Sequence, residues 1–507
     1  MVTTHRESEL KFDIQESAPL PDFAALPGVA TVAEPVEETL DATYFDSPDL
    51  RLAANGVTFR RRTGGHDAGW HLKLPAQEGS RTELRHPLGD DTEDAPDELR
   101  GPVRGLVRDD ELAPVARIQT TRTVYRLVGA DGTPLAEVAD DHVTGQLMGS
   151  DAEHTSWREV EVELVDGDDD LLPAAEGLLT GSGAERAAGP SKLARVLGDR
   201  VPRDREPAPT LAPESPAGDV LRAALRGDRD RLVTADRGVR LGTPDSVHQM
   251  RVAARRLRSI LGAFRPLVDR QVTDPLRDEL QWLGRVLGDA RDTEVMHERL
   301  VGLVHAQPPE LVLGPVTARI TSVMAERAAR ADEEVDAALN SDRYFRLLDS
   351  LDSVLADPPW TGSAGEPAQA VLPRRVRRSW KRVQRAAQAA DAAEPGEQRS
   401  TRLHEVRKAA KRARYAGEAV EPAFGKAAKR YAKRMKRLQS LLGDHHDAVV
   451  SEEQLREMGL QAHQAGENGF SYGVLHGAER SNAERAEAAY PDLYTRAAKK
   501  SVRRWLS

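Results

Sequence analysis

The chain has 507 residues and no cysteine, and 39% of its residues are hydrophobic, 30% charged and 4% aromatic. This length exceeds one ordinary domain, the composition is globular, and the lack of cysteine excludes disulfides, cysteine-ligated metals and thiol nucleophiles. The net charge of −10 combines a net charge of −19 over residues 1–200 with one of +15 over residues 371–440, so we expect the two parts to bind different partners.

The N-terminus carries no apolar stretch of the kind that signal peptides contain, and no apolar run of 18 residues follows. We therefore expect a cytoplasmic protein without a membrane partner. Residues 5–200 then form short alternating segments, such as 57–62, 70–74, 121–127 and 158–164. Alternation of this kind, with many β-branched residues, predicts an antiparallel sheet or barrel.

Charged residues share one face of several of these predicted strands, because side chains two positions apart point to the same side. They are Glu7, Glu9, Lys11, Arg60, Arg62, Lys73, Arg122, Arg126, Glu159, Glu161 and Glu163. A solvated strand face explains one such segment equally well, but several segments of mixed sign predict a closed sheet around a charged tunnel. Carboxylates there favour a hard divalent cation, and Arg and Lys neutralise phosphates. Phosphoryl transfer needs mainly this positioning and charge neutralisation.

Residues Glu7-Ser8-Glu9-Leu10-Lys11 match the ExExK signature of the CYTH family, the triphosphate tunnel metalloenzymes. The resemblance covers about 5–200 and is supported by residues 44–52, 57–62, 71–74 and 191–193. It implies an eight-stranded antiparallel tunnel that binds a triphosphate together with Mg²⁺ or Mn²⁺.

The same resemblance assigns roles to individual residues. Glu7, Glu9 and Lys11 are the implied catalytic set, and Lys11, Arg60, Arg62, Lys73, Arg122 and Lys192 are the implied phosphate ligands. The implied metal ligands are Glu7 and Glu9 with one or more of Asp141, Glu159, Glu161 and Glu163. Alternation with Glu137 favours Asp141 over Asp140, the choice among the three late glutamates stays open, and Glu83 is a further candidate for the tunnel.

Residues 201–218 are rich in proline and are predicted to be a linker, which gives a first domain over 1–200 and a second over 219–507. From about residue 219 the apolar period becomes 3.6, so the second domain is predicted to be all-α. His248 to Arg258 recurs 156 positions later as His404 to Arg414, and Leu283 to Asp292 recurs 155 positions later. We therefore expect two pseudo-twofold four-helix bundles, about 219–365 and 370–507, in an α+β multidomain protein.

Each repeat places a row of cations on one helix face. The rows are His248, Arg251, Arg255 and Arg258, and His404, Arg407, Lys411 and Arg414. Like charges at this spacing repel each other, which favours an anionic ligand. Basic runs over 374–385 and 426–437, including Lys433 and Arg437, extend the surface. The repeated pairs Asp289/Asp292 and Asp444/Asp447 could bind metal, but we expect an N-cap or salt-bridge role beside Arg291 and Lys436 instead.

These features resemble the CHAD domain, a conserved-histidine α-helical domain, over about 215–507. The resemblance implies that both rows, with Lys433 and Arg437, bind inorganic polyphosphate. The chain is thus expected to hydrolyse inorganic triphosphate, or a nucleoside triphosphate, with a divalent metal. The alternative is a non-catalytic polyphosphate-binding or granule-associated protein. Adenylyl cyclase ranks lower because no adenine pocket is evident, and the scarcity of aromatics among the cations argues against nucleic acid recognised by base stacking.

Overall fold

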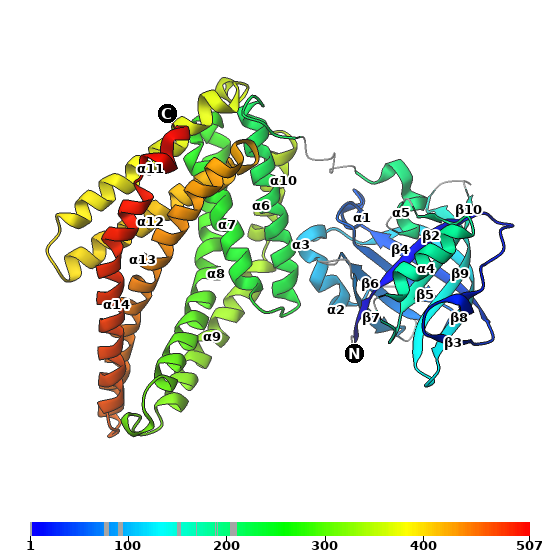
Figure 1. Cartoon of the computed structure of the whole chain (residues 1–507), viewed down its shortest axis with the longest axis horizontal. Helices are drawn as coiled ribbons and strands as arrows, with labels where there is room; N and C mark the ends of the chain where they lie inside the picture. The colour runs from blue at the N-terminus through cyan, green and yellow to red at the C-terminus, as the bar shows by residue number, and fades with distance from the viewer. Residues whose placement is uncertain are drawn as a thin grey trace. The chain divides into compact units, whose positions relative to one another are not determined.

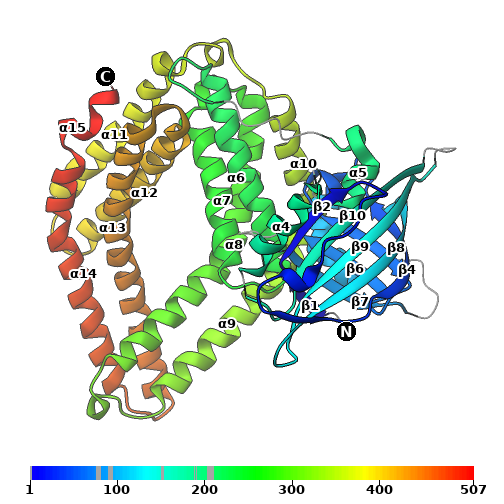
Figure 2. The same ribbon diagram turned by 45° about the vertical axis from the view of Figure 1, so that its right-hand side comes forward.

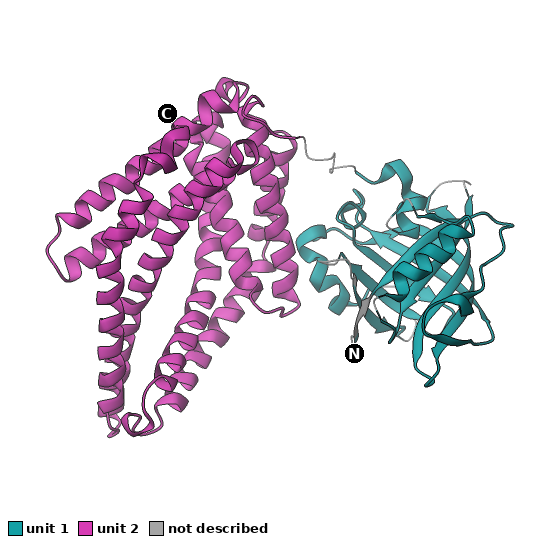
Figure 3. Cartoon of the chain, viewed as in Figure 1, with its two compact units in different colours: residues 1–207 teal, residues 208–507 magenta. Residues whose placement is uncertain are grey.

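The computed structural model describes residues 3–75, 81–89, 95–149, 154–168, 170–187, 189, 191–202 and 210–506, without the side chains of residues 4–7 and 81. The expected role of the Glu7 carboxylate therefore lies outside the described residues. The chain divides into two compact units, residues 1–207 and 208–507 (Figure 3). This division falls inside the proline-rich stretch 201–218.

The first unit contains one antiparallel sheet, in which neighbouring strands follow the order β1-β7-β6-β5-β4-β8-β9-β10-β2-β11, with β3 beside β8. The strands are β1 (Thr3–Glu7), β2 (Glu9–Ile14), β3 (Val29–Val32), β4 (Val36–Asp46), β5 (Thr58–Thr63), β6 (Gly69–Leu74), β7 (Arg81–Pro87), β8 (Ala113–Gly129), β9 (Pro134–Leu147), β10 (His154–Leu164) and β11 (Glu185–Arg186). The expected antiparallel sheet is confirmed. Short helices α1 (Arg51–Ala54), α2 (Asp97–Arg100) and α3 (Arg104–Val107) lie in its connections.

The sheet is strongly curved (Figure 2), but its ladders do not close. The order of paired strands ends at β1 and β11, so the expected closed eight-stranded barrel is wrong for the described ladders. The chain nevertheless joins both sides of the sheet, because β1 pairs with β7, β2 pairs with β10, and only Ser8 separates β1 from β2. One extended segment thus changes its pairing partner at Ser8, and alternation of residue types does not reveal such a change.

Helices pack on both faces of the sheet. Helix α4 (Leu171–Gly181) packs on β2 and β10, where Phe12, Val160 and Leu179 belong to one apolar core. Lys11 and Glu161, which alternate with these strand residues, line the inside of the curve.

Helix α5 (Lys192–Leu197) packs on β8 and β9 through buried apolar side chains, among them Leu193 and Val196. Tyr44 and Ile118 belong to the same apolar cluster and also line the inside of the curve, so α5 packs on the inner face.

The second unit is helical, as expected. Its helices are α6 (Ala217–Arg240), α7 (Ser246–Ala263), α8 (Arg270–His305), α9 (Val316–Leu339), α10 (Asp342–Ala356), α11 (Ala368–Asp391), α12 (Glu397–Ala419), α13 (Glu421–Gln464), α14 (Phe470–Ala497) and α15 (Lys500–Arg503). In a first series, α6 to α9, each helix packs on the next one along the chain, and the same holds for a second series, α11 to α14 (Figure 1). Helix α10 comes between the two series in the sequence. Among the described residues, no helix combines the length and apolarity needed to cross a membrane.

The two series of helices pack on each other. Helix α7 contacts α12, and α6 contacts α11. At the far ends, Leu300 and Ile320 share an apolar cluster with Met458 and Leu475 of the second series. The contact between α7 and α12 brings together the two helices that carry the predicted cation rows.

Candidate functional site

A cavity inside the curved sheet collects polar side chains from eight elements. The predicted residues that line it are Glu9, Lys11, Arg60, Arg62, Lys73, Arg122, Glu161, Glu163 and Lys192. Tyr44, Asp67 and Arg85 also line it, although the sequence analysis did not assign them. Within β4, β5 and β8 the lining residues are two positions apart, as in Arg60 and Arg62, so the period of the strands places them on the inner face.

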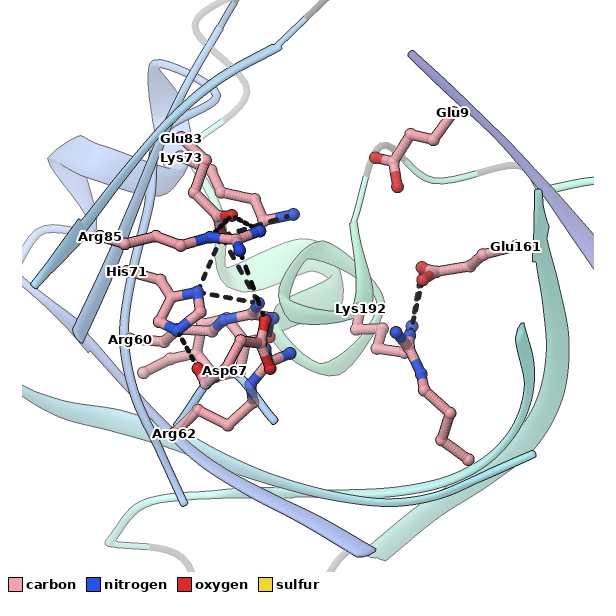
Figure 4. A network of polar contacts seen from close by, with 12 residues as sticks. Glu9, Arg60, Arg62, Asp67, His71, Lys73, Glu83, Arg85, Glu161 and Lys192 are labelled. Atoms are coloured by element: carbon pink, nitrogen blue, oxygen red, sulfur yellow. Dashed lines mark hydrogen bonds and ion pairs between the residues drawn. The ribbon is translucent and has the colours of Figure 1, made fainter. Parts of the chain in front are cut away.

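One wall of the cavity, here called the cationic wall, carries Arg60, Arg62, Lys73 and Arg85 around the fully buried Glu83 (Figure 4). Glu83 accepts a hydrogen bond of 2.5 Å from Arg85, and its Oε1 lies 3.7 Å from both Arg60 and Lys73. Burial alone would raise the pKa of Glu83, but hydrogen bonding by His71 and the charges of Lys73 and Arg60 hold it far below its usual value. Glu83 is therefore an anion that offsets part of the positive charge.

Two residues beside this wall, His71 and Asp67, were not assigned by the sequence analysis. The ring of His71 lies between Glu83, 2.8 Å from Nδ1, and the backbone oxygen of Asp67, 2.9 Å from Nε2. The Asp67 carboxylate forms an ion pair with Arg62. Asp67 lies in the turn between β5 and β6, where no period predicts the direction of a side chain. His71 shares the alternation of Lys73 and could have been found from it.

Opposite the cationic wall, Glu161 lines the cavity (Figure 4). With Asp141 and Glu159, which are buried and are not among the lining residues, it forms a group here called the acidic cluster. Each offers an oxygen within 4.8 Å of those of the other two. The register explains this, because Asp141 on β9 is the partner of Glu159 on β10, and Glu161 follows two residues later on the same face. Asp140 instead pairs with Arg158, 2.8 Å away, so Asp141 is the member of the pair that faces this cluster.

Three cations approach the acidic cluster. The Nζ atom of Lys192 lies 2.9 Å from Asp141, 2.6 Å from Glu159 and 2.8 Å from Glu161. Arg122 donates hydrogen bonds of 2.7 Å to both Asp141 and Glu161. Lys11 pairs with Glu161 and lies 3.0 Å from Glu9. Predicted phosphate ligands thus contact predicted metal ligands.

These contacts favour the charged forms of Glu161 and Lys192. Burial alone would raise the pKa of Glu161, but Lys11, Lys192 and Arg122 hold it well below its usual value. Burial alone would lower the pKa of Lys192, but the three carboxylates raise it well above its usual value. Glu161 therefore offers ionised oxygen donors.

The donor set fits a hard divalent cation such as Mg²⁺ or Mn²⁺, which prefers carboxylate oxygens. The Oε1 atom of Glu159 is buried and makes no hydrogen bond within the described residues, although it lies at ion-pair distance from Lys192. A buried carboxylate oxygen of this kind is suited to a cation. Glu9 and Glu163 line the same cavity beside the cluster.

A second candidate site lies where α7 contacts α12. Lys411 is surrounded there by the charges of Arg255, Arg407 and Arg251, with Asp292 as an acidic neighbour. Burial first, and then these three arginines, lower the pKa of Lys411 to about 7. Within the part of the chain that the structure describes, Lys411 forms no ion pair. This centre, here called the lysine centre, therefore has unbalanced positive charge.

The other members of the two rows are mostly partnered. Arg251 donates to Asp292 at 2.7 Å and Arg407 lies 3.8 Å from Asp447, so the repeated aspartates form salt bridges, but with these arginines rather than with Arg291 and Lys436. Arg258 donates to Gln281 and Arg414 donates to Glu418 at 2.7 Å. Lys433 and Arg437 are exposed on α13.

Burial favours the uncharged form of the two histidines that head the rows. Burial is the main cause that lowers the pKa of His248 and of His404. The ring of His404 lies 4.2 Å from that of His446, centroid to centroid. Burial, followed by His404 and Arg407, lowers the pKa of His446 to about 4. The positive charge of this region therefore comes from arginine and lysine.

Sequence analysis missed Tyr415, a buried residue beneath the rows. Its hydroxyl accepts a hydrogen bond of 3.1 Å from Arg255, which crosses from α7 to α12. The guanidinium groups of Arg255, Arg256 and Arg414 lie 5.9, 5.6 and 5.3 Å from the centre of its ring. Cation–π contacts of this kind hold arginines together that would otherwise repel.

Comparisons with known proteins agree with this division of the chain. The family model for the CYTH domain matches residues 5–196, and that for the CHAD domain matches residues 223–456. An uncharacterized protein of Mycobacterium tuberculosis (strain ATCC 25618 / H37Rv) is 39% identical over 497 residues, which cover 95% of this chain and 94% of that protein.

Two solved structures show more remote likeness. The CHAD domain from the plant Ricinus communis is 24% identical, with a TM-score of 0.41, and the match covers 60% of this chain and 95% of that one. A Hippeastrum protein, described as a candidate adenylyl cyclase with a dominant triphosphatase activity, is 19% identical, with a TM-score of 0.24 and coverage of 39% and 100%. The assignment of the chain to a protein family therefore rests on the two family models and on the mycobacterial relative.

Proposed function

Because the chain belongs to the proteins in which a CYTH domain precedes a CHAD domain, we propose that its sheet cavity hydrolyses inorganic triphosphate, or a related nucleoside triphosphate, and that its helical unit binds inorganic polyphosphate. CYTH domains form a family of triphosphate tunnel metalloenzymes. The observation that carries the proposal is one cavity that is lined both by the cationic wall and by Glu161, a member of the acidic cluster.

In this proposal Asp141, Glu159 and Glu161 hold Mg²⁺ or Mn²⁺, with Glu9 and Glu163 beside them; the same role for Glu7 stays a prediction. The bound metal would supply positive charge next to the phosphoryl group that is transferred. The arginines and lysines of the opposite wall bind the remaining phosphates. The reaction needs no nucleophilic side chain, because positioning and charge neutralisation are its main requirements.

The cationic wall is prepared for its substrate by Glu83. Four cations held close together would repel one another, and the buried carboxylate offsets this repulsion before a phosphate arrives. The Tyr44 hydroxyl accepts a hydrogen bond of 3.4 Å from Arg60 and orients that guanidinium. Preorganised donors of this type stabilise charge that develops on the phosphate oxygens during the reaction.

The test is phosphate release by the intact chain from inorganic triphosphate, ATP and long-chain polyphosphate, with Mg²⁺ or Mn²⁺. Glu9→Gln should abolish metal-dependent release, whereas Glu37→Gln should leave it unchanged, because Glu37 is an exposed glutamate on β4. Full turnover by the Glu9→Gln variant would reject this site. Formation of cyclic nucleotide from ATP would instead favour the cyclase.

A non-catalytic role at polyphosphate granules is the second candidate, and the lysine centre favours it, because unbalanced buried charge is relieved by an anion. The decisive comparison is polyphosphate binding by the intact chain against phosphate release from triphosphate. Binding without release would identify a binding protein. Displacement of polyphosphate by an equal charge concentration of DNA at fixed salt would reject polyphosphate as the ligand.

A further inference from the structure

We propose that the ammonium group of Lys192 occupies the place that a divalent metal takes in the acidic cluster, so that metal binding displaces Lys192 and frees it to bind phosphate. This inference rests on the proposed metal-dependent function. It gives Lys192 a part in metal binding as well as in substrate binding. Lys192 then competes with the metal for the three carboxylates and, once displaced, binds the substrate.

The geometry carries the first step. The Nζ atom of Lys192 lies between 2.6 and 2.9 Å from each of the three carboxylates that together form the candidate metal site. A point at hydrogen-bond distance from all three is also where a cation contacts the most oxygens. Two cations in one such place repel each other strongly, so Lys192 and the metal exclude one another.

Burial explains why a lysine is present in this position. Asp141 is fully buried and Glu159 is 4% exposed. Buried carboxylates without a compensating charge are strongly destabilising. Lys192 supplies that charge and allows the sheet to fold around the carboxylates without a metal. Arg122 differs, because it reaches only Asp141 and Glu161 among the three, through hydrogen bonds from β8.

The surrounding structure limits the movement to the side chain. Helix α5, which carries Lys192, is held by Leu193 and Val196, which are 1% and 8% exposed. Its N-terminus is capped by Ser191, whose Oγ accepts a hydrogen bond of 3.1 Å from the Ala194 N–H. The helix therefore stays in place while the flexible lysine side chain turns.

The cationic wall is the other charged surface near Lys192. The Tyr44 hydroxyl, which contacts Arg60, is within electrostatic range of both Lys73 and Lys192. Lys192 thus lies between the cationic wall and Glu161, as Figure 4 shows. A metal that takes its place in the acidic cluster would direct the ammonium to the phosphates opposite. The expected order of binding is metal first and triphosphate second.

The experiment measures Mn²⁺ affinity of the intact chain by calorimetry, without phosphate compounds. Lys192→Met should bind Mn²⁺ at least about tenfold more tightly than the unaltered protein, because the competing cation is gone. Its KM for triphosphate at saturating Mn²⁺ should rise. Lys192→Arg keeps the charge and should not bind Mn²⁺ more tightly.

Lys73→Met is the matched control, because Lys73 lines the same cavity but pairs with Glu83 on the cationic wall. It should raise the KM for triphosphate and leave Mn²⁺ affinity unchanged. Lys192→Gln, a second neutral variant, serves if Lys192→Met fails to fold, and it should change Mn²⁺ affinity in the same direction.

Glu161→Gln separates failure of the inference from failure of the proposed function. Weakened Mn²⁺ binding in Glu161→Gln, together with unchanged or weaker binding in folded Lys192→Met or Lys192→Gln, would overturn the role of Lys192 alone. Mn²⁺ binding that Glu161→Gln leaves unaltered would show that the metal is not held by the acidic cluster, and both proposals would fall.

Discussion

Two half-buried lysines in this chain lie in opposite electrostatic surroundings. Lys192 in the sheet unit contacts three carboxylates, which raise its pKa against the effect of burial. Lys411 in the helical unit has three arginine neighbours, which add to the effect of burial and lower its pKa to about 7. The sheet cavity therefore balances its own charge, whereas the lysine centre has an excess that an added anion, or loss of the Lys411 proton, relieves. The first site is suited to exchange of ions and the second to capture of a polyanion.

Glu83→Gln should have the largest effect, because it would leave the cationic wall with unbalanced positive charge, as in the lysine centre. Removing this buried charge leaves Arg60, Lys73 and Arg85 unbalanced, and we expect a loss of about 3 kcal/mol in the free energy of unfolding. Urea unfolding of the sheet unit within the intact chain measures this loss.

Added inorganic triphosphate should restore most of the lost stability, because its phosphates replace the missing negative charge. The control is Glu37→Gln, on the exposed side of β4, which should change stability by less than about 0.5 kcal/mol. A Glu83→Gln variant as stable as the unaltered protein, or one that triphosphate fails to stabilise, would contradict the role given to Glu83.

Lys411→Met should have a smaller effect of the opposite sign. The pKa of Lys411 is lowered to about 7 in the folded state, so between about pH 7 and the ordinary lysine pKa the unfolded chain binds more protons. Stability from this group therefore rises with pH across that window and is lowest below pH 7. Removing the charge should stabilise the helical unit at pH 6 by on the order of 2 kcal/mol. Denaturant unfolding at pH 6 and pH 9 tests this, and equal effects at both values would contradict it.

Polyphosphate affinity should also depend on the protonation of Lys411, but it should fall as the pH rises. Binding of a polyanion favours protonated Lys411, so affinity should fall by about tenfold from pH 6 to pH 9. The pKa of His446 is about 4, so this histidine does not titrate in that window. Calorimetry should show proton uptake on binding at pH 8 in the unaltered protein, and no such uptake in Lys411→Met. Equal uptake in both would assign the pH dependence to another group.

The smallest expected difference concerns the two repeats. Asp292 lies 2.7 Å from Arg251, whereas Asp447 lies 3.8 Å from Arg407. Asp292→Asn should therefore release more positive charge than Asp447→Asn and tighten polyphosphate binding at pH 6 by about threefold, since exposed ion pairs are weak. Binding at two salt concentrations provides the check. A larger effect of Asp447→Asn would show that the shorter pair is not the stronger one.

Strand period was enough to predict much of the cavity. Arg60, Arg62 and Glu161 line it because alternate residues share one face. The register was not predictable, because Asp141 meets both Arg122 and Glu159 only through the pairing of β8, β9 and β10. The segment around Ser8 alternates like any other strand, so the sequence did not predict that it changes its pairing partner there and leaves the ladders open.

The helical unit shows the same limit. The 3.6 period predicted both cation rows, and the repeat predicted the matching order of helices. The contact between α7 and α12 joins segments about 156 residues apart, and no local pattern encodes it. The burial of Lys411 and the place of Tyr415 follow from that contact alone, so neither was expected.

The most direct test of the proposed function is phosphate release from inorganic triphosphate by the intact chain and by Glu161→Gln, each with and without Mn²⁺. Glu161 contacts Lys11, Lys192 and Arg122 in the acidic cluster. We predict release only with Mn²⁺ and a loss of about 10³-fold in the variant, with polyphosphate binding by the helical unit unchanged. Release that needs no divalent metal, or that survives in Glu161→Gln, would contradict a metal-dependent triphosphatase in this cavity.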